Sequence, residues 1–134
     1  MKKLTIEAKI EKLPKVLAFL DEVLEEAECN MKAQMQLDIA VEEIYVNIAS
    51  YAYEGKDGMA DIEIDISADR VASVRFFDSG VPYDPLKKPD PDVTLSADER
   101  AIGGLGIFMV KKSMDDMSYE YKDGMNVLTI KKQI

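Results

Sequence analysis

The sequence lacks the residues on which several common kinds of catalytic and metal site depend. It has no histidine and no tryptophan, and Cys29 is its only cysteine. The usual zinc sites, Ser-His-Asp triads and Cys-His dyads are therefore excluded, and so is an internal disulfide. Any chemistry must use carboxylates, amides, backbone N–H groups and an ion taken from solution.

Basic residues are scarce, and long apolar runs are absent. The chain has 17 Lys and Arg residues against 26 Asp and Glu residues, a formal net charge of -9. Such a surface repels phosphate backbones and anionic lipid, so we expect no direct binding of nucleic acid and no membrane binding. No apolar run approaches the roughly 20 residues of a membrane span, and charged residues follow the start of the chain. We therefore expect a cytoplasmic protein.

Length and composition are typical of one folded domain. The chain has 134 residues, of which 47% are hydrophobic and 32% are charged. This composition provides enough apolar side chains for one core and enough charge for a soluble surface. We expect a single domain over residues 1–134.

Hydrophobic periodicity predicts the order of the secondary structure. Alternating apolar residues predict five strands, at residues 4–10, 60–67, 71–77, 117–122 and 126–132. Apolar residues three or four positions apart predict three helices, at about 14–27, 31–53 and from 103 onward. We expect an α+β fold, a two-layer α/β sandwich in which about three helices cover one face of a mixed, mostly antiparallel sheet.

Residues 79–102 interrupt this regular pattern. Four of the five prolines, Pro82, Pro85, Pro89 and Pro91, fall within this segment, and neither strand nor helix periodicity survives until about Ser96. Connections between elements are usually about 4 to 6 residues long, so a longer one is typical of a lid, a binding loop or a disordered segment.

Glu43 and Asn47 stand one turn apart in the second predicted helix, about 40° apart around its axis, so their side chains leave the same face. An asparagine oxygen can ligate a hard cation such as Mg²⁺, and a glutamate can accept a proton or orient a nucleophile. The same spacing also occurs in many surface helices that have no site.

Two glycine motifs follow. Asp78 ends an apolar strand, and Gly80, two residues later, would let a flat ligand approach the backbone, although Asp-x-Gly is also common in turns. Gly103, Gly104 and Gly106 open the third predicted helix, where free N–H groups favour an anion such as phosphate. They lack the lysine of a P-loop, and a hinge for the preceding segment is the competing interpretation.

Four segments in this order resemble a known family, the ATP-binding anti-sigma-factor serine kinases. These are small single-domain members of the ATPase superfamily shared with histidine kinases and gyrase. Residues 37–53 resemble the family's N box, residues 78–85 (DSGVPYDP) its next box, residues 103–110 (GGLGIFMV) its phosphate-loop box, and residues 123–130 (DGMNVLTI) its closing hairpin. The resemblance covers essentially the whole chain and implies a Bergerat-type ATP-binding fold.

The resemblance implies ATP and Mg²⁺ as cofactors and assigns roles on the second helix. Asn47 would bind the Mg²⁺ that bridges the phosphates, and Glu43 would be the base or orienter for an incoming serine hydroxyl. Many relatives have a histidine where Tyr51 stands. This departure bears on the rate of catalysis, although neither role is assigned to that position.

The resemblance also implies the nucleotide contacts and places a lid at about residues 79–102. Asp78 would accept a hydrogen bond from the adenine amino group, with Gly80 allowing close contact. Further nucleotide contacts are implied at Gly103, Gly104, Leu105, Gly106 and Thr129.

Two classes of function follow from this resemblance. The first is a serine/threonine protein kinase that phosphorylates a small anti-sigma-factor antagonist and sequesters a partner, with a sigma factor as the rival partner and a homodimer as the implied assembly. Because phosphoryl transfer mainly requires positioning and charge neutralisation, the absence of histidine is compatible with it. The second is an ATP-gated regulatory binding module without turnover. A histidine-kinase catalytic domain is disfavoured, because the chain has no histidine to phosphorylate.

Overall fold

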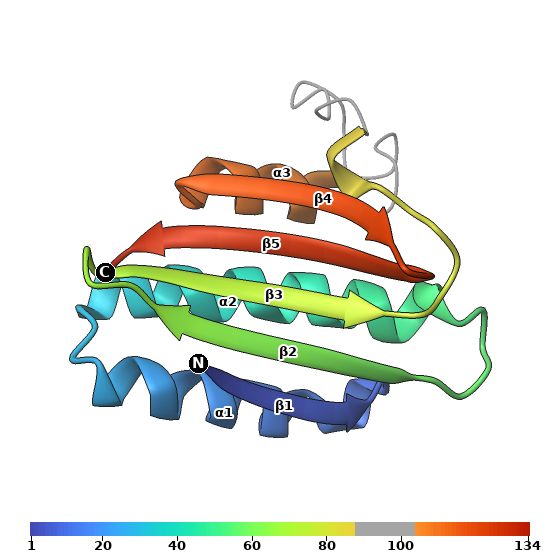
Figure 1. The fold of residues 1–134 in the computed structure, drawn as a ribbon, viewed down its shortest axis with the longest axis horizontal. Coiled ribbons are helices and arrows are strands. Elements are labelled where there is room, and N and C mark those ends of the chain that lie inside the picture. Colours follow the sequence, from blue (N-terminus) through green and yellow to red (C-terminus); the bar gives the residue numbers. More distant parts are fainter. Residues whose placement is uncertain (88–103) are drawn as a thin grey trace.

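A five-stranded sheet and one layer of helices make up the described part of the chain, residues 1–87 and 104–134 of the computed structural model (Figure 1). The strands pair in the order β1-β2-β3-β5-β4. Their bounds are Lys2–Glu7 (β1), Met59–Ile66 (β2), Val71–Asp78 (β3), Asp116–Lys122 (β4) and Met125–Gln133 (β5).

Every strand pair in the described residues is antiparallel. The expected two-layer α+β architecture is confirmed, whereas the expectation of a mixed sheet is wrong. Two successive helices join β1 to β2, and they return the chain to the end at which β1 finished, where Glu7 pairs with Met59. A parallel pair would need a connection that carries the chain back to the opposite end of the sheet, as a crossover through one helix does.

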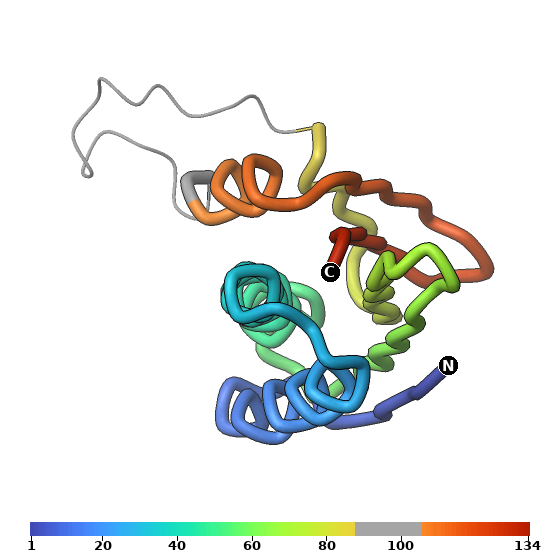
Figure 2. Tube along the Cα trace, turned by 90° about the vertical axis from the view of Figure 1, so that its left-hand side faces the viewer, coloured from blue at the N-terminus to red at the C-terminus, as the bar shows by residue number. Residues whose placement is uncertain are grey.

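The helices α1 (Leu13–Glu26), α2 (Met31–Asn47) and α3 (Gly104–Ser113) lie on one face of the sheet (Figure 2). The Asn30 side chain caps α2 by accepting a hydrogen bond from Ala33 N at 2.8 Å. None of the helices in the described ranges has the length and apolar character that a membrane span requires.

The ends of two elements differ from those that the hydrophobic periodicity predicts. The strand expected over residues 4–10 ends at Glu7, and Ile10 lies in a short 3₁₀ turn with 56% of its surface exposed. The helix expected over residues 31–53 is regular only to Asn47, and residues Ile48–Ala52 form one wider π turn. Such turns often occur at functional sites.

The core fills the space between the helical layer and the sheet. Its largest fully buried side chains come from both layers: Val16, Leu20, Leu24, Leu37, Val41, Tyr45, Ile62, Ile64, Val74, Phe76, Val110 and Ile130. The segment expected as a lid, residues 79–102, is described only as far as Lys87, where Pro85–Lys87 form one 3₁₀ turn. The rest of that segment lies outside the described residues.

Candidate functional site

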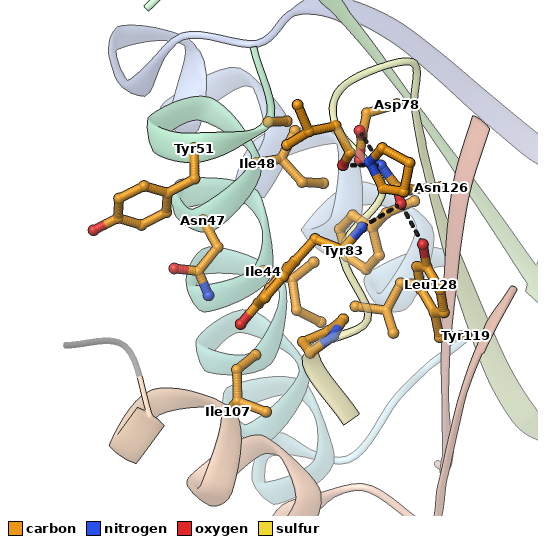
Figure 3. A pocket seen from close by; sticks show the side chains of 15 residues that line it. Ile44, Asn47, Ile48, Tyr51, Asp78, Tyr83, Ile107, Tyr119, Asn126 and Leu128 are labelled. Atoms are coloured by element: carbon orange, nitrogen blue, oxygen red, sulfur yellow. Dashed lines mark hydrogen bonds between the residues drawn. The ribbon is translucent and has the colours of Figure 1, made fainter. Parts of the chain in front are cut away.

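A cavity of about 440 Å³ opens where the end of α2 faces β3, β4 and β5 (Figure 3). Pockets for small ligands usually measure about 300 to 1,000 Å³, so this cavity is large enough for one. Most of the lining is apolar, and a few polar side chains interrupt it. The lining residues are Ile44, Asn47, Ile48, Tyr51, Ala52, Phe76, Asp78, Val81, Pro82, Tyr83, Pro85, Ile107, Tyr119, Asn126 and Leu128.

Asp78, at the end of β3, is the buried acceptor of this cavity, with 5% of its surface exposed. Its Oδ1 accepts hydrogen bonds from Gly80 N at 3.0 Å and from Asn126 Nδ2 at 2.9 Å. Burial raises the pKa of the Asp78 carboxyl above its ordinary value, and these two hydrogen bonds oppose that rise. Oδ2 accepts no hydrogen bond from the described residues, so it can serve a donor on a ligand in the cavity.

Asn126, which the sequence interpretation missed, is the partner of Asp78. The two residues face each other in the pairing of β3 with β5. Asn126 Nδ2 also donates to Val81 O at 2.9 Å, while Asn126 Oδ1 accepts from Tyr83 N at 3.1 Å and from the Tyr119 hydroxyl (Figure 3). Asn126 therefore joins three segments around the carboxylate and leaves none of its own amide atoms unpaired.

Thr129 lies on the wrong face of β5 for the nucleotide contact that the resemblance implied. Side chains alternate along a strand, and Asn126, Leu128 and Ile130 share the buried face. Thr129 pairs with the exposed Arg75 on the opposite face and does not line the cavity. We therefore replace Thr129 by Asn126 in the candidate site. A polar residue on the apolar face of an alternating strand is the signal that could have identified Asn126.

Glu43 and Asn47 lie on one face of α2, as their spacing predicts. Asn47 Nδ2 donates a long hydrogen bond of 3.3 Å to Glu43 Oε1, and both side chains are half-buried. Asn47 lines the cavity, while Glu43 stands beside it against α3. The hydrogen bond uses the NH₂ group of Asn47, so Asn47 Oδ1 remains available to a cation.

Among the described residues, no three His, Cys, Asp or Glu side chains gather as a metal site. A protein cage for a metal is therefore not present in this part of the chain. The donor set does fit Mg²⁺, which usually keeps several waters and takes only one or two protein ligands alongside substrate phosphates. The amide oxygen of Asn47 is such a ligand.

The glycines have different neighbours. A Cβ built on Gly80 would lie 2.2 Å from Ala52 O, and Val81 N donates to that same oxygen at 2.9 Å. The backbone after α2 therefore leaves no room for a side chain at position 80, and the expected approach of a ligand to Gly80 stays a prediction. Gly106 packs against the carboxylate of Glu43.

The remaining residues of the predicted phosphate loop are only partly described. Gly104 and Leu105 begin α3, where unpaired backbone N–H groups and the helix dipole favour an anion. Gly103 lies outside the described residues. The expected opening of a helix at this motif is confirmed.

A family model described as the histidine kinase-like ATPase domain matches residues 6–132. Among similar proteins, a serine-protein kinase RsbW from Listeria monocytogenes is 34% identical over 100 residues, which covers 71% of this chain and 63% of that protein. The serine/threonine-protein kinase BtrW from Bordetella bronchiseptica is 29% identical over 100 residues, covering 74% of this chain and 70% of that protein. The chain thus spans somewhat less than two thirds of the RsbW protein.

Two solved structures share the fold. The crystal structure of the RsbU and RsbW domains of a Mycobacterium tuberculosis protein has a TM-score of 0.67 and 15% identity, and the match covers 99% of this chain and 32% of that one. A histidine kinase domain from a blue-light-activated histidine kinase of Erythrobacter litoralis has a TM-score of 0.57 and 9% identity, over 92% of this chain and 60% of that one.

Proposed function

Because the chain belongs to the histidine kinase-like ATPase domain family, we propose that it binds Mg-ATP in this cavity and transfers the γ-phosphoryl group to a serine of a partner protein. The observation that carries the proposal is the shared geometry of two functional pairs. The buried Asp78–Asn126 pair and the Asn47–Glu43 pair are brought to one cavity by β3, β5 and α2. The first pair suits a nucleobase that carries a hydrogen-bond donor. The second pair suits a metal-bound phosphate and an attacking hydroxyl.

Adenine would occupy the apolar part of the cavity. Asp78 Oδ2 would accept a hydrogen bond from the exocyclic amino group, while Oδ1 remains held by Gly80 and Asn126. The apolar side chains of Ile44 and Leu128 give a flat base an apolar surface to contact. A nucleobase with a carbonyl in place of the adenine amino group would set one acceptor against another at Asp78 Oδ2 and bind less well.

The phosphates would lie toward Asn47 and the start of α3. Backbone N–H groups of the predicted phosphate loop, Gly103, Gly104, Leu105 and Gly106, would donate to the phosphate oxygens. Asn47 Oδ1 would ligate Mg²⁺, with phosphates and waters as the other ligands. The ion, when bound, neutralises negative charge on the phosphates during transfer.

Glu43 would act on the incoming serine. The serine oxygen forms a bond to the γ-phosphorus, the bond from that phosphorus to the β–γ bridging oxygen breaks, and ADP leaves with the electron pair. The hydroxyl proton passes to the Glu43 carboxylate. Asn47 holds that carboxylate through the hydrogen bond to Oε1 and so fixes its place beside the cavity.

For the partner, we propose a small protein of the anti-sigma-factor antagonist type, with a sigma factor as the competing client and a homodimer as the assembly. Support comes from relatives that bear the name serine-protein kinase RsbW. Residues 1–134 carry a net charge of -9, so a partner whose contact surface is not strongly acidic is favoured.

Glu43→Gln tests the kinase proposal. Phosphate incorporation into a candidate antagonist encoded beside this gene should fall about 10²- to 10⁴-fold, because the amide cannot accept the serine proton. Affinity for Mg-ATP, measured on the same sample, should persist, since Glu43 does not line the cavity. If the wild-type protein binds Mg-ATP but modifies no cognate partner, the kinase proposal fails and an ATP-gated binding module remains.

A further inference from the structure

Gly106, in the first turns of α3, packs directly against the Glu43 carboxylate of α2. A Cβ built on Gly106 would lie 2.0 Å from Glu43 Oε1 and 2.2 Å from the carboxyl carbon of that side chain. Real Cβ atoms essentially never approach a neighbour closer than 3.0 Å. Any side chain at position 106 therefore requires Glu43 to move.

The oxygen that Gly106 accommodates is also the oxygen that Asn47 holds. Glu43 Oε1 accepts the 3.3 Å hydrogen bond from Asn47 Nδ2, and the same oxygen occupies the space that a Cβ on Gly106 would need. Displacing it would break or lengthen that hydrogen bond. One added methyl group would thus move the Glu43 carboxylate and remove its hydrogen bond to Asn47 Nδ2, while Asn47 Oδ1, the proposed Mg²⁺ ligand, keeps its place.

The consequence of such a displacement differs between Gly106 and Gly80. At Gly80 the obstacle is the backbone carbonyl of Ala52, which cannot move without distorting the chain. At Gly106 the obstacle is the end of a flexible glutamate side chain, which can rotate away. A substitution at Gly106 is therefore expected to leave the fold intact and to shift the carboxylate.

We propose that Gly106 is a positioning residue for Glu43. The missing side chain leaves the space in which the carboxylate stands when it receives the serine proton. This inference rests on the proposed kinase function and adds a second role to a glycine that the sequence motif links only to phosphate binding. It predicts that Gly106 acts on turnover through Glu43.

A double-mutant cycle tests this inference with four proteins: wild type, Gly106→Ala, Glu43→Gln and the double variant. For each, the rate of phosphate transfer at saturating Mg-ATP and the dissociation constant for Mg-ATP are measured. Gly106→Ala should slow transfer by about 10²-fold, the cost of a misplaced catalytic group, and change the dissociation constant less than about threefold. In the Glu43→Gln background it should have no further effect on transfer.

Two results would overturn the inference while leaving the kinase proposal intact. One is an equal effect of Gly106→Ala in both backgrounds, which would mean that it does not act through Glu43. The other is a raised dissociation constant with unchanged transfer, which would leave Gly106 with the phosphate role alone. Transfer at the wild-type rate by the Glu43→Gln single variant would instead refute the proposed role of Glu43 itself.

A readout without turnover completes the test. The side-chain amide resonance of Asn47 reports the position of Glu43 through their hydrogen bond, so it should shift in Gly106→Ala. Met109→Ala is the matched control, because Met109 lies on the same helix with 55% of its surface exposed. An Asn47 resonance at the same position in wild type and Gly106→Ala would contradict the inference even if no partner is phosphorylated.

Discussion

Replacing Asp78 by asparagine should convert the base-binding end of the cavity from an acceptor to a donor. The asparagine carbonyl oxygen would take the place of Oδ1, because Gly80 N and Asn126 Nδ2 both donate there, at 3.0 and 2.9 Å. Its NH₂ group would then occupy the Oδ2 position and face the adenine amino group, which is also a donor. The fold should survive, since both internal hydrogen bonds are kept.

The expected loss follows from one mispaired, desolvated contact. Leaving a buried polar group unpaired costs about 1 to 3 kcal/mol, which corresponds to a roughly 5- to 150-fold weaker affinity for ATP. ADP should lose as much, because the contact is to the base. ITP carries a carbonyl where ATP carries the amino group, so the variant should bind ITP relatively better and the ATP-to-ITP affinity ratio should fall.

Calorimetric titration of wild type and Asp78→Asn with ATP and with ITP measures both effects. Asp65→Asn is the matched control, since it removes one carboxylate from an exposed position of β2. A folded Asp78→Asn protein whose ATP-to-ITP ratio equals that of wild type would refute the reasoning and leave Asp78 as a structural residue of the turn.

Three further changes test other parts of the account. Asn47→Ala should weaken Mg-ATP binding by about 10- to 100-fold, because a ligand to a charged group is lost, and calorimetry with and without Mg²⁺ should show the difference only with the metal. Gly80→Ala should lower the free energy of unfolding by about 1 to 3 kcal/mol in urea titrations, because its Cβ would lie 2.2 Å from Ala52 O. A Gly80→Ala variant as stable as wild type would contradict that packing. Asp38 Oδ1 is buried without a hydrogen-bond partner among the described residues, and burial and the nearby Asp21 raise the pKa of Asp38 to about 7. A raised carboxyl pKa stabilises the fold at low pH and loses that contribution as the pH rises from about 4 through about 7. The full pKa shift would correspond to a loss of about 4 kcal/mol in the free energy of unfolding when Asp38 ionises, and solvent screening of this partly exposed group reduces that loss. Asp38→Asn should therefore be about 1 kcal/mol more stable than wild type at pH 8 and no more stable at pH 4. A constant difference across that range would refute the titration.

The interior of the fold could be predicted from local periodicity, but the ends of its elements could not. The predicted alternation in β2 and the predicted apolar face of α2 are both found in the structure, because each element buries one face and that face determines its pattern of apolar residues. The end of β1 is different. The hydroxyl of Tyr45, on α2, lies 2.8 Å from the carbonyl oxygens of Glu7 and Lys9, either of which can accept its single proton, and it accepts from Lys9 N at 3.1 Å. This distant contact turns the chain while the apolar alternation continues to Ile10.

In the candidate site, too, local sequence patterns predict some features, whereas others depend on contacts between distant segments. The Glu43–Asn47 pair follows from helical spacing, which is a local property. The choice between Asn126 and Thr129 depends on which face of β5 lies under the helices, and the alternation of the strand would have given it. The contact of Gly106 with Glu43 joins two helices far apart in the sequence, so no spacing rule could predict it.

Binding of the nucleotide to this cavity is the central claim, and a residue-resolved titration tests it most directly. Nitrogen-15-labelled protein would be titrated with a non-hydrolysable ATP analogue and Mg²⁺ and followed by NMR. We predict that the largest shifts occur at the Gly80 backbone amide, the Asn47 and Asn126 side-chain amides, and Gly106. No shifts at these positions, or shifts confined to the outer face of the sheet around Arg75, would contradict the account.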